Sequence, residues 1–168
     1  VDREGDIWAG TAEGPVVFDG GGDIFNGHQG SRIKVEQDGV LNYLFGEETI
    51  YTIAVDGANR KWFGTGSGVF VQSPAGNEEV ASYTTANSPL LDNRIIDIAI
   101  DGNNGVVYIA TDGGIMSVRT DAISGEDVHS DEVYAWPNPV RPGYDGPIAI
   151  RGLANDAVVK ITDVSGQI

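Results

Sequence analysis

The sequence predicts an all-β fold whose first two thirds form part of a β-propeller. Three observations support this prediction: one short pattern recurs three times, strand-like runs alternate in hydrophobicity, and glycine is abundant, with 24 residues among 168. The tryptophans of the first two copies, Trp8 and Trp62, are 54 positions apart, and the closing threonines of the last two, Thr65 and Thr111, are 46 apart. Because a propeller blade repeats every 40 to 50 residues or so, each copy accounts for about one blade.

Each repeat contains a strand that ends in a tight turn. In the run 95–100, the alternation predicts Ile96, Ile98 and Ile100 on one face of a pleated strand, and the run 50–55 is its counterpart in the preceding unit. An aspartate and a glycine then follow within five residues in all three copies. This chemistry suits a hairpin that needs a positive φ or a local bond from the aspartate side chain. The turn residues are Asp2 with Gly5, Asp56 with Gly57, and Asp101 with Gly102 and Gly105.

A second strand follows, with an aromatic residue, then a small residue and threonine. We expect the aromatic side chains to supply most of the apolar area between adjacent sheets, and the small residues to lie where neighbouring backbones approach closely. The repeat residues are Trp8, Gly10 and Thr11; Trp62, Gly64 and Thr65; and Tyr108, Ala110 and Thr111. Another glycine turn leads each time into a third strand, at 16–18, 69–71 and 115–118.

These residues resemble a known family. The pattern D-x-x-G-x-W-x-G-T-x-x-G is similar to the regulator-propeller repeat, found in periplasmic sensor regions of hybrid two-component proteins and in type IX secretion components of the PorZ kind. The resemblance covers residues 1 to 120 or so. It weakens between Gly20 and Glu48, where no copy of the pattern fits, and in the third copy, where Tyr108 and Ala110 replace Trp and Gly.

The chain changes character after Asp121. A polar, acidic stretch around residues 123–132 is typical of a linker. The following residues, Tyr134-Ala135-Trp136-Pro137-Asn138-Pro139 and Ile161-Thr162-Asp163-Val164-Ser165-Gly166, resemble the immunoglobulin-like C-terminal domains of surface proteins in type IX secreting bacteria. Such a module needs roughly seven strands in about 100 residues, so only its opening strands are expected here.

We therefore predict three segments: propeller blades at 1–122, a linker at 123–132, and an incomplete immunoglobulin-like, sorting-type domain at 133–168. Closed propellers need at least four blades, so we expect the chain to be a fragment of a larger protein. Open strand edges and uncovered blade faces favour self-association. The resemblance implies an extracytoplasmic location, either periplasmic or at the cell surface in association with the outer membrane.

The amino-acid composition argues against several classes of function. The net charge of −15 and the absence of clustered Lys and Arg argue against a nucleic-acid surface. No cysteine is available for a disulfide or a thiolate metal site. No apolar run approaches the roughly 20 residues of a spanning helix, and no signal peptide is visible.

The sequence shows no catalytic constellation, and we predict neither enzyme activity nor a cofactor. The only histidines, His28 and His129, fall in expected loops without a nucleophile or an H-E-x-x-H spacing. Residues 64–68 are glycine-rich but lack the signature of a phosphate loop, so a hairpin is the better interpretation. The pairs Glu47-Glu48 and Glu78-Glu79 are expected to be solvated loop charges rather than acid/base pairs.

We predict no metal site either. The acidic turns at 101–105 and 19–23 look calcium-like, but they lack the ligand spacing of an EF-hand, so turn chemistry is favoured over incidental calcium binding.

A binding surface is expected at one end of the blades. In an up-and-down blade, the turn from the second to the third strand shares an end with the connection to the next blade, and loops clustered on a rigid scaffold commonly bind ligands. The candidates are Glu13, Ser67, Asn93, Arg94 and Asp112, although each of them could simply terminate a hairpin. Trp136 is a further exposed-aromatic candidate, with packing against a propeller side as the favoured alternative.

Two functions fit these patterns. The first is a non-enzymatic surface or secretion component that binds protein partners or a glycan. The second is the sensor region of a hybrid two-component receptor that recognises a glycan or another small ligand. The motifs at Trp136-Pro137-Asn138-Pro139 and Ile161–Gly166 favour the first, because they resemble a sorting-type module rather than a domain that precedes a membrane span.

Overall fold

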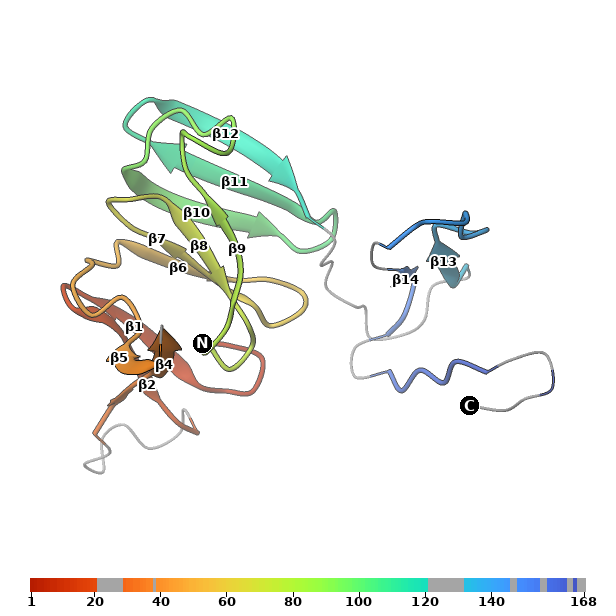
Figure 1. The fold of residues 1–168 in the computed structure, drawn as a ribbon, viewed down its shortest axis with the longest axis horizontal. Helices are drawn as coiled ribbons and strands as arrows, with labels where there is room; N and C mark the ends of the chain where they lie inside the picture. The colour runs from red at the N-terminus through yellow and green to blue at the C-terminus, as the bar shows by residue number, and fades with distance from the viewer. Residues whose placement is uncertain are drawn as a thin grey trace. The chain divides into compact units, whose positions relative to one another are not determined.

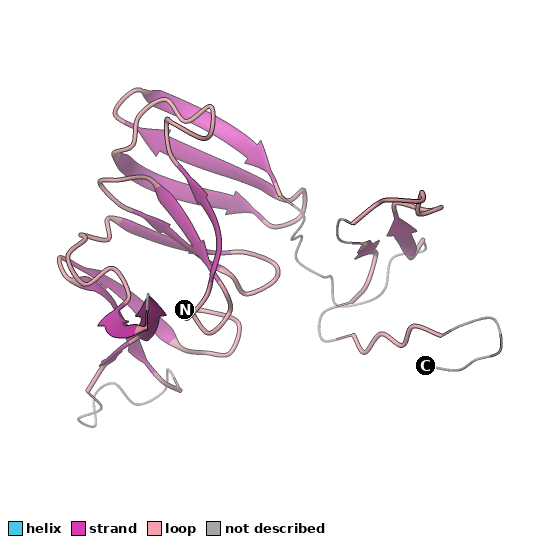
Figure 2. Ribbon diagram, in the orientation of Figure 1, coloured by secondary structure: helices cyan, strands magenta, loops and turns pink. Residues whose placement is uncertain are grey.

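The computed structural model describes residues 1–20, 29–37, 39–120, 132–145, 148–154, 157–162 and 165, whose regular secondary structure is entirely β-strand (Figure 2). Within those ranges, no helix has the length and apolar character needed to cross a membrane. The chain divides into two compact units, Val1–Ile123 and Ser124–Ile168. Since His28 and His129 lie outside the described residues, their predicted loop positions stay predictions.

Three of the four described antiparallel sheets in the first unit have three or four strands, and we call them blades 1, 2 and 3 (Figure 1). Blade 1 comprises β1 (Ile7–Thr11), β2 (Gly14–Phe18) and β3 (Ser31–Arg32). Blade 2 comprises β6 (Thr52–Val55), β7 (Lys61–Gly64), β8 (Val69–Gln72) and β9 (Glu79–Tyr83). Blade 3 comprises β10 (Ile95–Asp101), β11 (Val106–Thr111) and β12 (Gly114–Arg119). The predicted strands of each repeat are confirmed, and the order β6-β7-β8-β9 is the simple meander of a propeller blade.

An additional hairpin, β4 (Lys34–Gln37) with β5 (Val40–Tyr43), lies between the last strand of blade 1 and the first strand of blade 2. No copy of the repeat pattern fits this region of the sequence, because the hairpin is an insertion in the connection between two blades. The connection between blades 2 and 3, residues 84–94, carries no strand.

Blades 2 and 3 pack through a continuous apolar core. Trp62 is 2% exposed and packs with Val71 from its own blade and with Ile98, Val107 and Ile109 from blade 3. Tyr83 stacks on the Trp62 ring at a centroid distance of 5.8 Å. Because sheets gain stability by burying one face against another, this tryptophan is the central apolar contact of the junction.

Blades 1 and 2 pack through a second, smaller core. Phe63 is fully buried and contacts Trp8 of blade 1, with ring centroids 6.0 Å apart. Leu44 and Ile50, from the connection between these blades, complete the cluster. The predicted role of Trp8 and Trp62 between adjacent sheets is therefore confirmed.

The same prediction is wrong for Tyr108 in the described structure. By strand register, Tyr108 occupies the position of Trp62, since it pairs with Ala99 as Trp62 pairs with Ala54. Its side chain nevertheless lies on the face of blade 3 opposite to blade 2, where it is 47% exposed together with Ile115 and Ile96. No described sheet of the first unit covers this face.

The predicted alternation of β10 also needs correction. A bulge between Ile95 and Asp97 shifts the register, so Ile95 is 1% exposed while Ile96 is 54% exposed. Beyond the bulge, Ile98 and Ile100 face the core as predicted. Because a β-bulge adds one residue to a strand, it reverses the side-chain pattern on one side of itself.

The second unit contains one described antiparallel pair, β13 (Tyr134–Trp136) with β14 (Ala149–Arg151). The peptide bonds before Pro137 and Pro139 are cis. Trp136 is 63% exposed. The immunoglobulin-like assignment of this region stays a prediction.

Candidate binding surfaces

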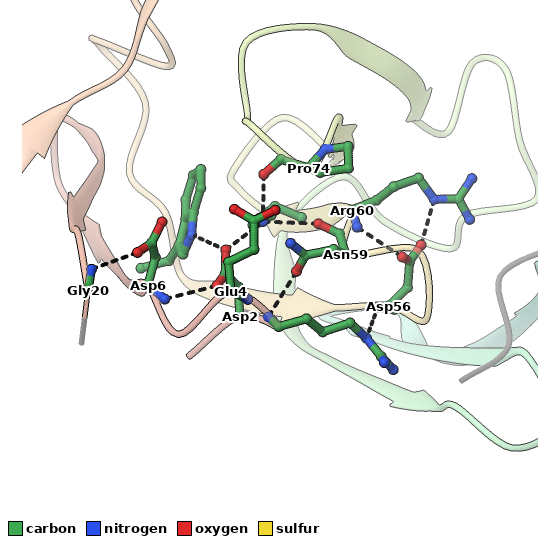
Figure 3. Close-up of polar contacts among 11 residues, drawn as sticks. Asp2, Glu4, Asp6, Gly20, Asp56, Asn59, Arg60 and Pro74 are labelled. Carbon is green, nitrogen blue, oxygen red and sulfur yellow. Dashed lines mark hydrogen bonds and ion pairs between the residues drawn. The ribbon is translucent and has the colours of Figure 1, made fainter. Parts of the chain in front are cut away.

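The aspartates that open the first two hairpin turns, Asp2 and Asp56, organise those turns through their carboxylates (Figure 3). One oxygen of Asp56 accepts hydrogen bonds from the backbone N–H groups of Ala58 and Arg60, at 2.9 and 3.0 Å. The other oxygen accepts a bond from the Trp62 indole N–H at 3.0 Å and pairs with Arg60 Nε at 2.6 Å. The aspartate thus joins the turn to the tryptophan that packs between blades, which explains the fixed D-to-W spacing of the repeat.

Asp2 repeats this arrangement in the first copy. Its carboxylate accepts bonds from the backbone N–H groups of Glu4 and Asp6 and from the Trp8 indole N–H at 3.1 Å. In the third copy, Asp101 accepts bonds from Asn103 and Asn104, with 2.7 Å to the Asn104 side chain. It makes no indole bond because Tyr108 replaces the tryptophan. Turn chemistry therefore accounts for the carboxylate that looked calcium-like in the sequence.

A buried lysine joins blades 1 and 2. Lys61 occupies the register position that Ile7 and Val107 hold in the other copies, yet it is fully buried. Its ammonium group lies 2.8 Å from the Asp2 carboxylate, donates to the carbonyl oxygens of Asn59 and Pro74, and lies 4.9 Å from the centre of the Trp8 ring. All three donors of the ammonium thus have acceptors, as a buried charge requires.

The ion pair changes the acidity of Asp2. Burial raises the pKa of the Asp2 carboxyl, but hydrogen bonds from Lys61, Asp6 and Trp8 and the charge of Lys61 outweigh it, so the pKa lies below its ordinary value of 3.8. Asp2 is therefore ionised at neutral pH and serves as the counter-ion of Lys61.

The opposite end of each blade is closed by a threonine turn. The hydroxyl groups of Thr11, Thr65 and Thr111 each donate to the carbonyl oxygen three residues later, at 2.7, 3.1 and 2.9 Å. In every copy, the threonine hydroxyl oxygen also accepts a hydrogen bond from the backbone N–H two residues later. This bonding explains the G-T-x-x-G part of the repeat, because a Ser or Thr hydroxyl can replace backbone partners in a turn.

We call the end formed by these threonine turns and the connections between blades the loop face. Two of the predicted candidates meet there: Arg94 Nη1 lies 3.1 Å from the Asp112 carboxylate, and both side chains are about half exposed. Asp112 raises the pKa of the Arg94 guanidinium, which also lies 5.8 Å from the centre of the Tyr51 ring. Arg94 therefore stays charged and is held in place without being buried.

The other candidates are tied to neighbouring segments. Ser67 donates to the Glu48 carboxylate, and Asn93 accepts a bond from the Thr85 backbone N–H at 2.8 Å. Glu13 forms an ion pair with Arg32 at 3.5 Å. All five candidates contact another segment at this end of the blades, and their role in binding stays a prediction.

A groove that the sequence analysis did not predict lies between the inserted hairpin and blade 2. It has a volume of about 780 Å³. Arg32, Tyr43, Phe45 and their neighbours form one wall, and Phe70, Gln72, Asn77 and Glu79 form the other. Phe45 joins the walls because its ring lies 5.2 Å from Phe70 and 5.4 Å from Phe63.

Groups of three or more His, Asp or Glu side chains placed to hold a metal ion are absent from the described residues.

No protein-family model and no curated protein matches the chain. Among solved structures, PorZ of Porphyromonas gingivalis, a bacterial surface component of the type IX secretion system, matches 99% of this chain with 34% sequence identity and a TM-score of 0.70. The chain carries a PorZ-like regulator propeller. It spans 23% of the length of PorZ.

Two extracellular domains from B. thetaiotaomicron are more distant. One belongs to a one-component system, with 17% identity, a TM-score of 0.49 and coverage of 79% of this chain and 15% of that chain. The other belongs to a hybrid two-component system, with 26% identity, a TM-score of 0.43 and coverage of 72% and 20%.

Proposed function

We propose that the chain is a non-enzymatic, extracytoplasmic binding and scaffold part of a type IX secretion complex, with the loop face contacting protein partners. The main support for this proposal is the similarity to PorZ over 99% of the chain. The geometry supports the same role. Asp–Trp turns and apolar junctions make the blades rigid, whereas the loop face carries exposed charged groups that no described segment covers.

The fold also supports the choice of surface. Recognition residues commonly lie on loops that a rigid scaffold positions. Arg94 and Asp112 are ordered by their mutual ion pair, so these two side chains would lose little conformational entropy when a partner binds. Glycan binding at the same face is a further proposal, which rests only on the resemblance stated above.

The test is made in the native bacterium with the intact gene. Deleting the codons for the blades, residues 1–120, should leave type IX cargo proteins inside the periplasm, and the wild-type gene should restore their export. The double variant N93A/R94A should reduce export while the protein still reaches wild-type levels.

Normal export after the deletion would contradict the proposal. If export stays normal but expression of a particular gene set is lost, the chain is instead the sensor region of a signalling receptor. These outcomes separate the two functions that the sequence left open.

A further inference from the structure

The groove between the inserted hairpin and blade 2 has an aromatic floor. The rings of Phe45 and Phe70 lie 5.2 Å apart and are tilted by 50°, and Tyr43 is 47% exposed at the wall of the groove. Arg32 covers one side of the Tyr43 ring at 4.3 Å from its centre. An apolar floor of this kind can receive the aliphatic stem of a side chain.

The groove also contains a buried polar group without a partner in the described structure. Gln72 is only 2% exposed, and its carboxamide makes no hydrogen bond with another described residue. No fully enclosed side-chain nitrogen or oxygen is left unpaired in the described residues, so the carboxamide must reach the groove that Gln72 lines. A carboxamide has both a donor and an acceptor, the same combination that a peptide bond offers.

The charge of the groove is negative. Three carboxylates line it, those of Glu36, Glu47 and Glu79. The one cation among the lining residues, Arg32, is already engaged: it pairs with the Glu13 carboxylate at 3.5 Å, donates to the Glu13 carbonyl oxygen and lies on the Tyr43 ring. The groove therefore repels anions and attracts cations.

We propose that this groove binds a lysine or arginine side chain from an extended segment of a protein partner. The three carboxylates receive the cationic head, the rings of Phe45 and Phe70 contact the stem, and the Gln72 carboxamide pairs with the peptide backbone. This inference rests on the proposed binding role and assigns it a particular groove, whose Arg32 pairs with the loop-face residue Glu13.

The test uses the full 168-residue chain and a short fluorescein-labelled peptide that carries two lysines in an otherwise uncharged sequence. Fluorescence anisotropy should show binding that weakens as salt rises from about 50 mM to about 500 mM, because solvent-accessible charges are screened over that range. The same peptide with glutamine or glutamate in place of both lysines should bind at least about tenfold more weakly.

Glu79→Gln removes one groove carboxylate and should weaken binding of the lysine peptide about five- to tenfold. Glu78→Gln is the matched control, since Glu78 is the adjacent residue, carries the same charge and does not line the groove. Unfolding curves should be the same for both variants.

Equal effects of the two variants would overturn the inference, as would equal binding of the lysine and glutamine peptides. Displacement of the lysine peptide by a neutral oligosaccharide, maltoheptaose, would overturn it in favour of a sugar site. If the peptide does not bind the groove but cargo export still depends on residues 1–120, the proposed function is supported and only the role of the groove is rejected.

Discussion

At the residue scale, the repeat aspartates differ in how much they stabilise. Asp56 is 1% exposed, and its carboxylate accepts four hydrogen bonds, three from the turn residues Ala58 and Arg60 and one from Trp62. Asp101 lies at the surface and bonds only within its own turn. The repeat aspartate therefore contributes more to stability in the second copy than in the third.

We expect Asp56→Ala to lower the free energy of unfolding by about 3 kcal/mol, because it leaves buried donors, including the Trp62 indole and Arg60, without their acceptor. Asp101→Ala should cause a much smaller loss, since water replaces its bonds. Urea unfolding followed by tryptophan fluorescence measures both variants. Equal losses would show that the indole bond contributes nothing.

Asp2 predicts a dependence of stability on pH. Its folded pKa is lowered, so its contribution is fully present above the unfolded value near 3.8 and is lost as pH falls through the lower folded value. The difference in unfolding free energy between wild type and Asp2→Asn should therefore be largest at pH 6 and shrink progressively below about pH 4. A difference that stays constant down to pH 2 would contradict the assignment. Comparing the two proteins cancels the effect of the other carboxyl groups of this acidic chain.

At the element scale, the small residue of the repeat allows two segments to meet. A Cβ atom on Gly64 would lie 2.5 Å from Thr52 Cγ2 and 2.6 Å from Ile95 Cγ2, both on β-branched side chains of neighbouring strands. A Cβ atom on Gly10 would lie 2.8 Å from the Ile50 carbonyl oxygen and 3.0 Å from Ile50 Cγ2. The predicted close approach at these glycines is thus confirmed.

Gly64→Ala should destabilise the chain by about 1–3 kcal/mol through overpacking. Gly66→Ala is the matched control, because a Cβ there meets only the Tyr51 ring at 3.9 Å and the backbone φ is unstrained. Thermal unfolding should show a lower Tm for Gly64→Ala and little change for Gly66→Ala. A similar Tm for both variants would mean that the strands simply move apart.

The strands of the blades could be predicted because alternation and glycine turns are local signals. The hairpin β4–β5 was missed although Asp38-Gly39, between two short strand-like runs, is a strong hairpin signal. The groove itself could not be predicted, because it depends on contacts between residues such as Tyr43 and Asn77, which are far apart in the sequence.

At the scale of the whole molecule, the blades follow from the repeat but the exposure of their faces does not. Tyr108 shows why: its position in the repeat predicts burial, and only the presence of a covering sheet decides whether burial occurs. Loop-face neighbours such as Arg94 and Asp112 were foreseeable from topology, because a connection and a turn share one end of a blade.

The 168-residue chain alone should self-associate through the open face of blade 3, which exposes Ile96, Tyr108 and Ile115. Light scattering across a concentration series should show a molar mass that rises with concentration. Ile115→Glu should shift this equilibrium toward monomer, because it places a charge within the exposed apolar patch. A stable monomer of the wild-type chain at all concentrations would contradict the prediction.

The central claim is that the loop face contacts protein partners outside the cytoplasm, and site-specific photo-crosslinking in the native bacterium tests it most directly. A photoreactive amino acid at Asn93 of the intact protein should yield adducts with envelope proteins. The same group at Ala58, exposed in the turn at the other end of blade 2, should yield few or none. Adducts from Asn93 alone are the result that the account predicts. No adducts from Asn93, or the same adducts from both positions, would contradict it.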